Sequence, residues 1–239
     1  MKRFTSVLLF WTLVTVQTFG QKNFPNDRDS DLQQISPPHT FEIVKDIDGN
    51  NYHTVKIGDQ IWMVENLKVT HYRNGAPIEN YSKTDFCDKR VPLYIDYEGN
   101  PALSKTFGRL YNWFAATDPR NIAPQGWHVP SKEEWQILFG YLGGEDVAGG
   151  KLKEAGPAHW KAPNTGGTNE SGFTALPYGT LNAAMSCAFE PNKGKGTIFW
   201  TTSGKVFKCV VTLSHKNGKA DIWCTWSPSE GIYVRCVKD

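Results

Sequence analysis

Histidine and cysteine are the side chains that most often bind metals or act as nucleophiles, and they are scattered along this sequence. No two histidines have the i, i+4 spacing of a helical metal pair, and there is no Cys-x-x-Cys sequence. The nucleophile motif Gly-x-Ser-x-Gly is also missing. The best placed histidine is His128, just before a predicted helix start. Since a metal ligand needs companions, we expect a packed histidine with a backbone partner there, and no catalytic residue or metal site.

A second candidate for chemistry is the tripeptide Glu190-Pro191-Asn192. Calcium-dependent lectins of the animal type use such a tripeptide to hold calcium and two sugar hydroxyls. Those lectins also carry Trp-Asn-Asp on a later strand, where this chain has Trp223-Cys224-Thr225. Because two oxygen ligands do not hold calcium without several more, we predict no cofactor, with calcium as the lesser alternative. The ligand-binding candidates are Glu190, Asn192, His128, Trp223 and Trp226.

The alternating oxygen-bearing residues Asp46, Asp48 and Asn50 also suggest a calcium loop. The twelve-residue calcium loop would end in a glutamate, and this chain has Ile57 there. Asp48-Gly49 is instead typical of a tight hairpin turn, because glycine adopts positive φ angles. We therefore predict a turn here.

The N-terminal 20 residues have the parts of a signal peptide: Lys2-Arg3, an apolar run over Phe4 to Val16, and small residues before Gln21. No cysteine follows the run, so we expect export without lipid attachment, and no membrane span in the mature chain. Residues 21–40 are polar and contain proline, which predicts a flexible lead-in. The remaining residues, 41–239, form the predicted domain.

The overall charge argues against two classes of partner. Without Lys2 and Arg3, 24 basic residues balance 24 acidic ones. Nucleic acids and anionic membranes bind mainly through clustered lysine and arginine, so we expect neither as a partner. The chain is rich in aromatic residues, with nine Trp, nine Tyr and thirteen Phe. We assign most of them to the core, and the rest are candidate platforms for stacking on sugar rings.

Five cysteines in an exported chain predict disulfides with at least one thiol left over. Cys209 and Cys224 lie on opposite arms of a hairpin predicted around Asn217-Gly218, and are the best candidates for a pair. With the turn centred on Asn217-Gly218 the two cysteines are diagonal, so a bulge is needed for bonding geometry.

Two helices should position the central part of the chain. The spacing of Leu110, Trp113 and Phe114 predicts one face of a short helix that ends before Pro119. Ser131 and Glu134 form a capping box at the start of a second helix, which Gly143-Gly144 ends. The apolar stripe of this second helix contains Trp135, Leu138, Phe139 and Leu142.

Short strands and turns surround these helices. Turns are predicted at Asp48-Gly49, Gly58-Asp59, Asn74-Gly75 and Asn217-Gly218. A further short helix is predicted at Lys151–Ala155. Strands are predicted near Leu93–Tyr97 and over Phe173–Leu176, Phe199–Thr202, Val206–Leu213, Ala220–Trp226 and Ile232–Val237. Two helices among short antiparallel strands, with long loops in the second half, indicate an α+β fold.

Several blocks give the chain a family resemblance. The sequence GRLYNWFAA, followed by PQGWHVPSKEEW, is similar to the Fibrobacter succinogenes major paralogous domain family. Further blocks lie at Asp48 to Gly75, Ala148 to Gly156, Ser171 to Gly179, Phe199 to Ser203 and Tyr233 to Asp239. The resemblance covers nearly everything from Phe41 onward. It implies a secreted or surface bacterial domain with a C-type-lectin-like fold, and no established activity.

The resemblance also bears on the cysteines. In many members of the family a cysteine before the P-x-G-W-H turn could pair with the final R-C-V segment; here that position is Ala123, so Cys236 loses this partner. Either Cys87 or Cys187 could replace it. Formylglycine-generating enzymes share the broad fold and hold copper between two cysteines, which here would require Cys224 and Cys236 to lie on adjoining strands.

These observations favour an exported, non-catalytic binding or surface-interaction protein, with polysaccharide or another cell-surface component as its partner. Two alternatives are an oxidase that uses cysteine and copper, and a structural envelope protein crosslinked through the unpaired cysteine.

Overall fold

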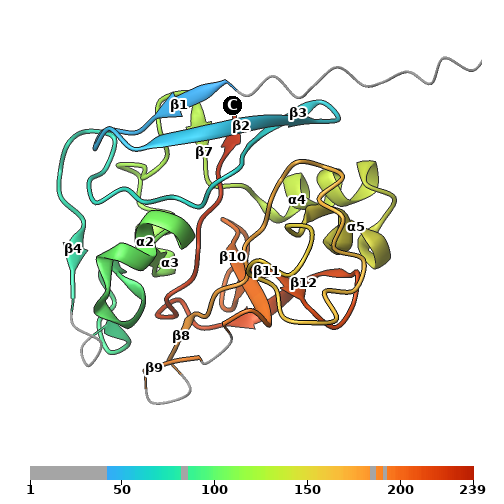
Figure 1. Ribbon diagram of the computed structural model, residues 1–239. Coiled ribbons are helices and arrows are strands. Elements are labelled where there is room, and N and C mark those ends of the chain that lie inside the picture. The colour runs from blue at the N-terminus through green and yellow to red at the C-terminus, as the bar shows by residue number, and fades with distance from the viewer. Residues whose placement is uncertain (1–41, 82–85, 184–186, 191–192) are drawn as a thin grey trace, which may run out of the picture. The chain divides into compact units, whose positions relative to one another are not determined.

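The computed structural model describes residues 42–81, 86–183, 187–190 and 193–239. These residues form mostly antiparallel strands in several small sheets, together with four α-helices and one 3-10 helix, which is an α+β architecture (Figure 1). The helices are η1 (Tyr97–Gly99), α2 (Pro101–Phe107), α3 (Trp113–Ala116), α4 (Lys132–Tyr141) and α5 (Glu145–Leu152).

The largest sheet has five strands in the order β1-β2-β3-β13-β7. Its strands are β1 (Ile43–Lys45), β2 (Asn51–Ile57), β3 (Gln60–Met63), β13 (Val237–Lys238) and β7 (Trp127–His128). Predicted turns at Asp48-Gly49 and Gly58-Asp59 join its first three strands. Val237 faces both Trp62 and His128, so the last strand closes this sheet between β3 and β7 (Figure 1).

A second sheet has the order β10-β11-β12, with strands β10 (Gly196–Trp200), β11 (Lys208–Ser214) and β12 (Ala220–Trp226). β12 has the predicted bounds, whereas β10 and β11 are shifted from theirs. Leu213 faces Ala220, so the connecting loop is centred between Lys216 and Asn217 rather than on Asn217-Gly218. Continued by one pair beyond Val210 and Trp223, this register places Cys209 directly opposite Cys224 rather than diagonal to it, so the expected need for a bulge came from the misplaced turn; a register shift follows between Val210 and Lys208.

Two smaller sheets complete the strand arrangement. β4 (Glu79–Asn80) pairs in parallel with β5 (Leu93–Ile95), which pairs with β6 (Leu110–Tyr111). β8 (Leu181–Asn182) pairs with β9 (Ala188–Phe189).

The structure corrects the predicted position of the first helix. Leu110 belongs to β6, and the helix begins only at Trp113, because the Asn112 side chain accepts a hydrogen bond from the amide of Ala115 and caps it. The second helix follows the prediction, and Ser131 and Glu134 form both hydrogen bonds of the capping box.

The predicted helix at Lys151–Ala155 is also misplaced, because α5 already begins at Glu145. Glycine is a poor helix former, yet the pair Gly149-Gly150 allows close packing here. A Cβ on Gly149 would lie 1.9 Å from the Lys219 carbonyl oxygen, and one on Gly150 would lie 2.3 Å from that of Gly166.

The predicted strands at Phe173–Leu176 and Ile232–Val237 are largely absent. Thr174 has a φ of 54°, which breaks an extended segment, and Ala175 makes only an isolated bridge to Lys153. Ile232 and Tyr233 make single bridges to Tyr111 and Phe199 before the chain reaches β13.

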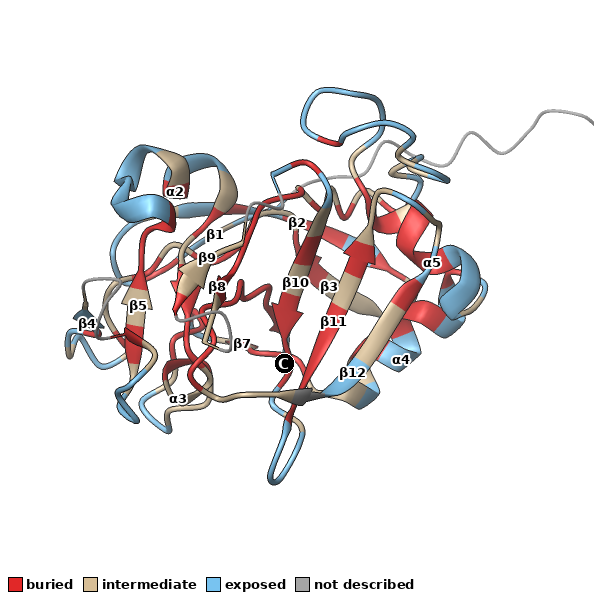
Figure 2. Ribbon diagram, turned by 90° about the horizontal axis from the view of Figure 1, so that it is seen from below, coloured by how far each residue is buried: buried red, intermediate tan, exposed pale blue. Residues whose placement is uncertain are grey.

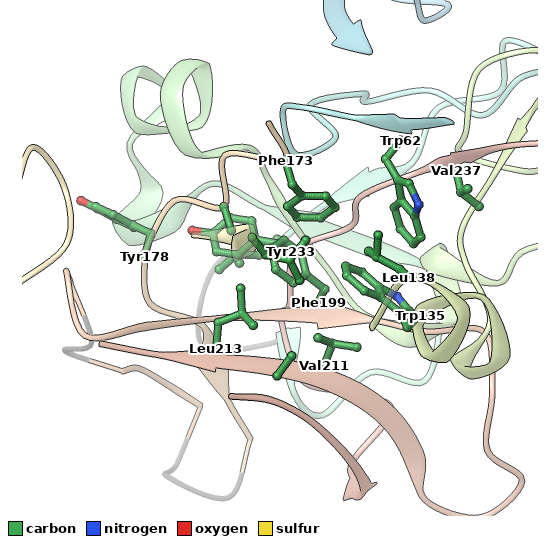
Figure 3. Close-up of a cluster of buried hydrophobic side chains, with 14 of the residues drawn as sticks. Trp62, Trp135, Leu138, Phe173, Tyr178, Phe199, Val211, Leu213, Tyr233 and Val237 are labelled. Carbon is green, nitrogen blue, oxygen red and sulfur yellow. The ribbon is translucent and has the colours of Figure 1, made fainter. Parts of the chain in front are cut away.

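Large aromatic side chains fill the core between the two main sheets (Figure 3). Trp62 and Trp135 are fully buried with ring centroids 4.6 Å apart, and Trp135 stacks on Phe199 at 5.5 Å. Trp127 is buried as well, whereas Trp113 is half-buried. Most of the aromatic residues therefore pack the interior, as expected from their number.

Candidate functional site

An open cavity of about 310 Å³ lies beside β10 and β11, and we call it the trough. One wall comes from the start of β10, the end of β11 and the loop that follows β11, and the other from the segments before β8 and after β9. The lining side chains used below are Tyr178, Glu190, Lys195, Ile198, Thr212 and His215.

The wall opposite β10 is fixed by a close backbone approach. The amide of Glu190 donates to the Thr180 carbonyl at 2.8 Å, and the Tyr97 hydroxyl donates to the Glu190 carbonyl at 2.7 Å. Gly179 lies in this crossing, where a Cβ would be 2.3 Å from the Glu190 carbonyl oxygen. The Glu190 carboxylate accepts a hydrogen bond of 2.6 Å from the Asn182 amide. These hydrogen bonds therefore fix the position of the Glu190 side chain at the edge of the trough.

The opposite rim is cationic. The amide of His215 donates to the Lys195 carbonyl at 2.8 Å, which brings the end of β11 beside the start of β10. His215 Nδ1 lies 3.0 Å from the Ala162 carbonyl, so this nitrogen carries a hydrogen and donates it. Lys195 and Lys216 are exposed there.

The loop that carries His215 and Lys216 is anchored from below by Lys153. This side chain is fully buried, and its ammonium donates to the carbonyls of Thr165, Ser214 and Asn217, each at 2.9 Å. Burial lowers the pKa of Lys153 to about 8. Sequence reasoning missed this residue, because nothing in a lysine's local sequence indicates burial.

Trp223 lies on the same face of the β10-β11-β12 sheet as the trough. Thr212 faces Asp221 across the strands, and Trp223 is two residues further along β12. Trp223 is 54% exposed, whereas Trp226 is half-buried and packs against the core. In Figure 2 the part of β12 toward its arrowhead is accordingly pale blue, the colour of exposed residues, whereas β10 and β11 are mostly red and tan.

The other predicted ligand residues lie elsewhere or outside the described part of the chain. Asn192 falls outside the described residues, as does Pro191. His128 lies on β7 in the five-stranded sheet, apart from the β10-β11-β12 sheet. The structure thus brings Glu190 to the trough, with Trp223 on the same sheet face, and leaves His128 in a separate environment.

His128 has two carboxylate partners rather than the expected backbone partner. Its Nδ1 lies 2.7 Å from Asp239 and its Nε2 lies 2.6 Å from Glu134, the capping residue of α4. Burial lowers the pKa of His128, but these hydrogen bonds outweigh burial and raise it above its usual value. Both nitrogens donate only in the protonated ring, so His128 links β7, α4 and the end of β13 as a cation.

The acidic residues near the first turn are fully used by protein donors. Asp46 accepts from two backbone amides, from the Asn50 side chain and from the Tyr52 hydroxyl. Asp48 accepts from Thr70 and His71. This arrangement corresponds to the predicted turn. Across the described residues, no group of three or more His, Cys, Asp or Glu side chains could hold a metal ion.

Two disulfides cross-link the part of the chain around the trough sheet. Cys209 bonds to Cys224, the pair that the sequence favoured, and Cys87 bonds to Cys187. Cys236 is the free and buried cysteine, so neither Cys87 nor Cys187 replaces its lost partner. A copper site between Cys224 and Cys236 is overturned as well, because Cys224 is already bonded.

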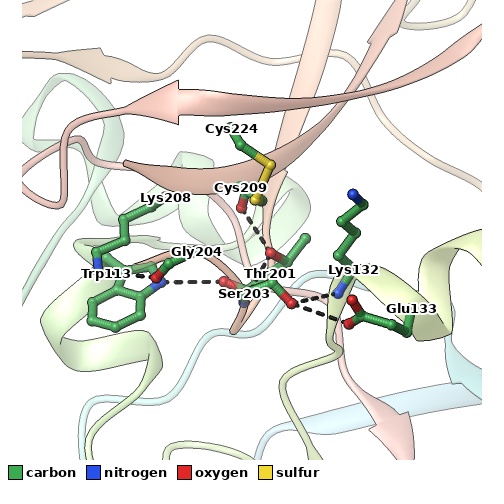
Figure 4. The surroundings of a disulfide bond; sticks show 9 residues. All are labelled: Trp113, Lys132, Glu133, Thr201, Ser203, Gly204, Lys208, Cys209 and Cys224. Atoms are coloured by element: carbon green, nitrogen blue, oxygen red, sulfur yellow. Dashed lines mark hydrogen bonds between the residues drawn. A yellow bond between two sulfur atoms is a disulfide. The ribbon is translucent and has the colours of Figure 1, made fainter. Parts of the chain in front are cut away.

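The Cys209–Cys224 bond lies next to the contact between β10 and α4 (Figure 4). The Thr201 hydroxyl donates to the Cys209 carbonyl at 2.9 Å. The Ser203 hydroxyl then accepts from the amide of Lys132 at 3.0 Å and lies 3.3 Å from the Glu133 carboxylate. The backbone of Cys209 is therefore linked through Thr201 and Ser203 to the first turn of α4.

A buried carboxyl near the trough was not foreseen. Glu230 is 4% exposed, and its carboxylate accepts a 2.8 Å hydrogen bond from the amide of Ala183. Burial, assisted by the nearby charge of Glu190, raises the pKa of Glu230 to about 7 despite that hydrogen bond.

Comparison with known protein families gives one match, the Fibrobacter succinogenes major domain, over residues 55–238. The chain belongs to this family. No curated protein and no solved structure gives a match. Among the described residues, no helix is long and apolar enough to cross a membrane.

The residues that identify this Fibrobacter succinogenes major domain build its frame. Arg235, from the last sequence block, is fully buried and donates two hydrogen bonds to the Asn66 side chain and one of 2.6 Å to the Phe173 carbonyl. Asn66 in turn donates to the Phe107 carbonyl. Burial lowers the pKa of Arg235 to about 9. Three blocks distant in sequence thus meet around one guanidinium, away from the trough.

Proposed function

We propose that the mature chain is an exported, non-catalytic binding protein with a C-type-lectin-like fold, and that it recognises polysaccharide at the trough and at Trp223. The main support is the shared sheet face of an exposed tryptophan and a trough with polar side chains. Sugar rings pack their apolar faces on aromatic side chains, and their hydroxyls need hydrogen-bonding groups nearby.

Three further observations support export and the proposed fold. The N-terminal residues have the composition of a signal peptide. Two disulfides fit an oxidising compartment. β13 pairs with β3, so the last strand joins the sheet that contains the first three strands, which fits the outline of a lectin-like fold.

The alternatives have less support. The copper oxidase loses its cysteine pair, because Cys224 is in a disulfide. A crosslinked envelope protein would need an accessible thiol, and Cys236 is fully buried.

Binding can be tested with the purified mature protein on a glycan array and in affinity electrophoresis through gels that contain plant or bacterial polysaccharides. The Trp223→Ala variant should bind the retained polysaccharide about tenfold more weakly, since a stacking platform is lost. Tyr141→Ala is the matched control, because Tyr141 is 66% exposed on α4 and should not affect retention. If no carbohydrate retains the wild-type protein, the polysaccharide part of the proposal is wrong.

A further inference from the structure

The charges around the trough are unevenly distributed. Lys195, His215 and Lys216 lie along one rim, and Lys195 and Lys216 form no ion pair among the described residues. Lys193 lies nearby, but its charge is offset by Glu98 at 2.9 Å. Among the lining residues the only carboxylate belongs to Glu190.

Glu190 lies on the wall opposite this positive rim. Its carboxylate accepts the Asn182 amide at 2.6 Å, which holds the carboxylate beside Asn182 without removing its charge. Lys195 and Lys216 nevertheless place two cationic side chains against this one carboxylate among the lining residues.

A buried charge adds to the field at this rim. Lys153 donates to the carbonyls of Ser214 and Asn217, which flank His215 and Lys216, and forms no ion pair with a carboxylate among the described residues. Its ammonium therefore lies directly below the rim as a positive charge without a paired carboxylate. Low-dielectric surroundings extend the field of such a charge into an adjacent cavity.

The geometry also fixes the rim in place. The backbone bond from His215 to Lys195 joins β11 to β10, the amide of Thr165 donates to the His215 carbonyl at 3.0 Å, and Lys153 ties the loop from below. A pre-organised cationic rim costs little ordering entropy when an anion binds.

Resting on the proposed polysaccharide-binding function, we infer that the trough selects anionic polysaccharides, whose carboxylate or sulfate groups bind at the rim of Lys195, His215 and Lys216. Neutral overall charge does not oppose this inference, because a local pair of lysines over a buried ammonium acts at short range. The sugar hydroxyls would contact Thr212 and Glu190, which line the same trough.

Matched polymers with and without charge give the sharpest test. Affinity electrophoresis and calorimetry would compare polygalacturonate with its fully methyl-esterified form, and dextran sulfate with dextran. We expect binding to one or both anionic polymers, at least about tenfold weaker binding to the neutral counterpart, and weakening with added salt. Binding in the first pair identifies a carboxylated ligand, and binding in the second a sulfated one.

Variants locate the binding charge. The double variant Lys195→Gln/Lys216→Gln should bind the anionic polymer about tenfold more weakly, with a smaller salt dependence. Lys56→Gln, which removes an exposed lysine on β2 in the other sheet, is the matched control and should leave binding unchanged. Circular dichroism would verify that all variants are folded; if the double variant is not, the single Lys216→Gln variant serves, with a loss of about threefold expected.

The outcomes separate this inference from the proposed function. Equal binding of charged and neutral polymers would overturn the anionic selectivity and leave polysaccharide binding in place. If the double variant binds the anionic polymer as tightly as the wild type, the assignment of the binding site to Lys195 and Lys216 is wrong, because other charged residues would then bind the polymer. Retention on none of the polymers or glycans would overturn both.

Discussion

The five-stranded sheet and the β10-β11-β12 sheet are stabilised in different ways. Beside the first, just outside the ends of β3 and β13, residues of the family blocks are buried and hydrogen-bonded to one another, as with Arg235 and Asn66. The second carries one disulfide and is anchored by the buried Lys153, yet it leaves Trp223 and the trough open. The family blocks therefore build the frame, whereas a ligand at the trough would meet residues that mostly lie outside these blocks.

Removal of the disulfides should cause the greatest loss of stability. Cys87–Cys187 spans 100 residues and Cys209–Cys224 spans 15. Because a longer closed loop restricts the unfolded chain more, Cys87→Ser/Cys187→Ser should lower the free energy of unfolding by about 5 kcal/mol and Cys209→Ser/Cys224→Ser by about 3 kcal/mol. Urea unfolding measures both, and equal losses would contradict this ranking.

The next prediction tests the frame. Arg235→Met should destabilise the protein by about 3 kcal/mol, because the Asn66 side chain and the Phe173 carbonyl would lose their buried donor. The control is Arg90→Met at an exposed position, where a change within about 0.5 kcal/mol is expected. If thermal unfolding gives the same change in the free energy of unfolding for both variants, the buried network contributes nothing to the stability of the frame.

A comparable effect, dependent on pH, is expected near the trough. The pKa of Glu230 is raised to about 7 in the folded protein, so the folded state retains a proton that the unfolded state releases near its usual pKa of 4.5. The contribution of Glu230 to the free energy of unfolding is therefore greatest below about pH 4.5. It falls as the pH rises to about 7 and is constant above that.

Glu230→Gln should remove this dependence. The variant should match the wild type at pH 4 and exceed it by up to about 3 kcal/mol at pH 8. Urea unfolding of both proteins across this range measures the difference. A constant difference at every pH would mean that the pKa of Glu230 is the same in the folded and unfolded protein, and would contradict the raised pKa.

A smaller effect is expected where α5 packs on the loop before β12, in the second region. Gly149→Ala would place a Cβ 1.9 Å from the Lys219 carbonyl oxygen, so we expect a loss of about 2 kcal/mol. Gly140→Ala in α4 is the control, since nothing lies within 4 Å of its Cβ, and it should stabilise by about 0.5 kcal/mol. Scanning calorimetry distinguishes the opposite signs, and a stabilising Gly149→Ala would disprove the close approach.

How much could be predicted from the sequence depended on whether the deciding contact was local. The capping box at Ser131 and Glu134, the tight turns of the first sheet and the bounds of β12 followed from neighbouring residues. The hairpin loop after β11 was placed one residue off, because its carbonyls bind Lys153, about sixty residues away in sequence. Patterns among neighbouring residues cannot predict a contact between residues so far apart in the sequence.

The same distinction applies to the candidate site. Trp223 and Glu190 were identifiable by residue type, and the bond between Cys209 and Cys224 by the hairpin pattern. The cationic rim was not, because Lys195 and His215 are distant in sequence and meet only through the pairing of β10 and β11. The partners of His128 were missed for the same reason, since Asp239 reaches it only through β13.

The position of β13 has a consequence for how the molecule is made. Val237 and Lys238 fill the gap between β3 and β7, although more than a hundred residues separate them from either strand. Until that segment emerges from the ribosome, two strand edges remain unpaired, and such edges recruit other chains. A nascent chain that stalls shortly before Val237 should therefore be the form most in need of a chaperone.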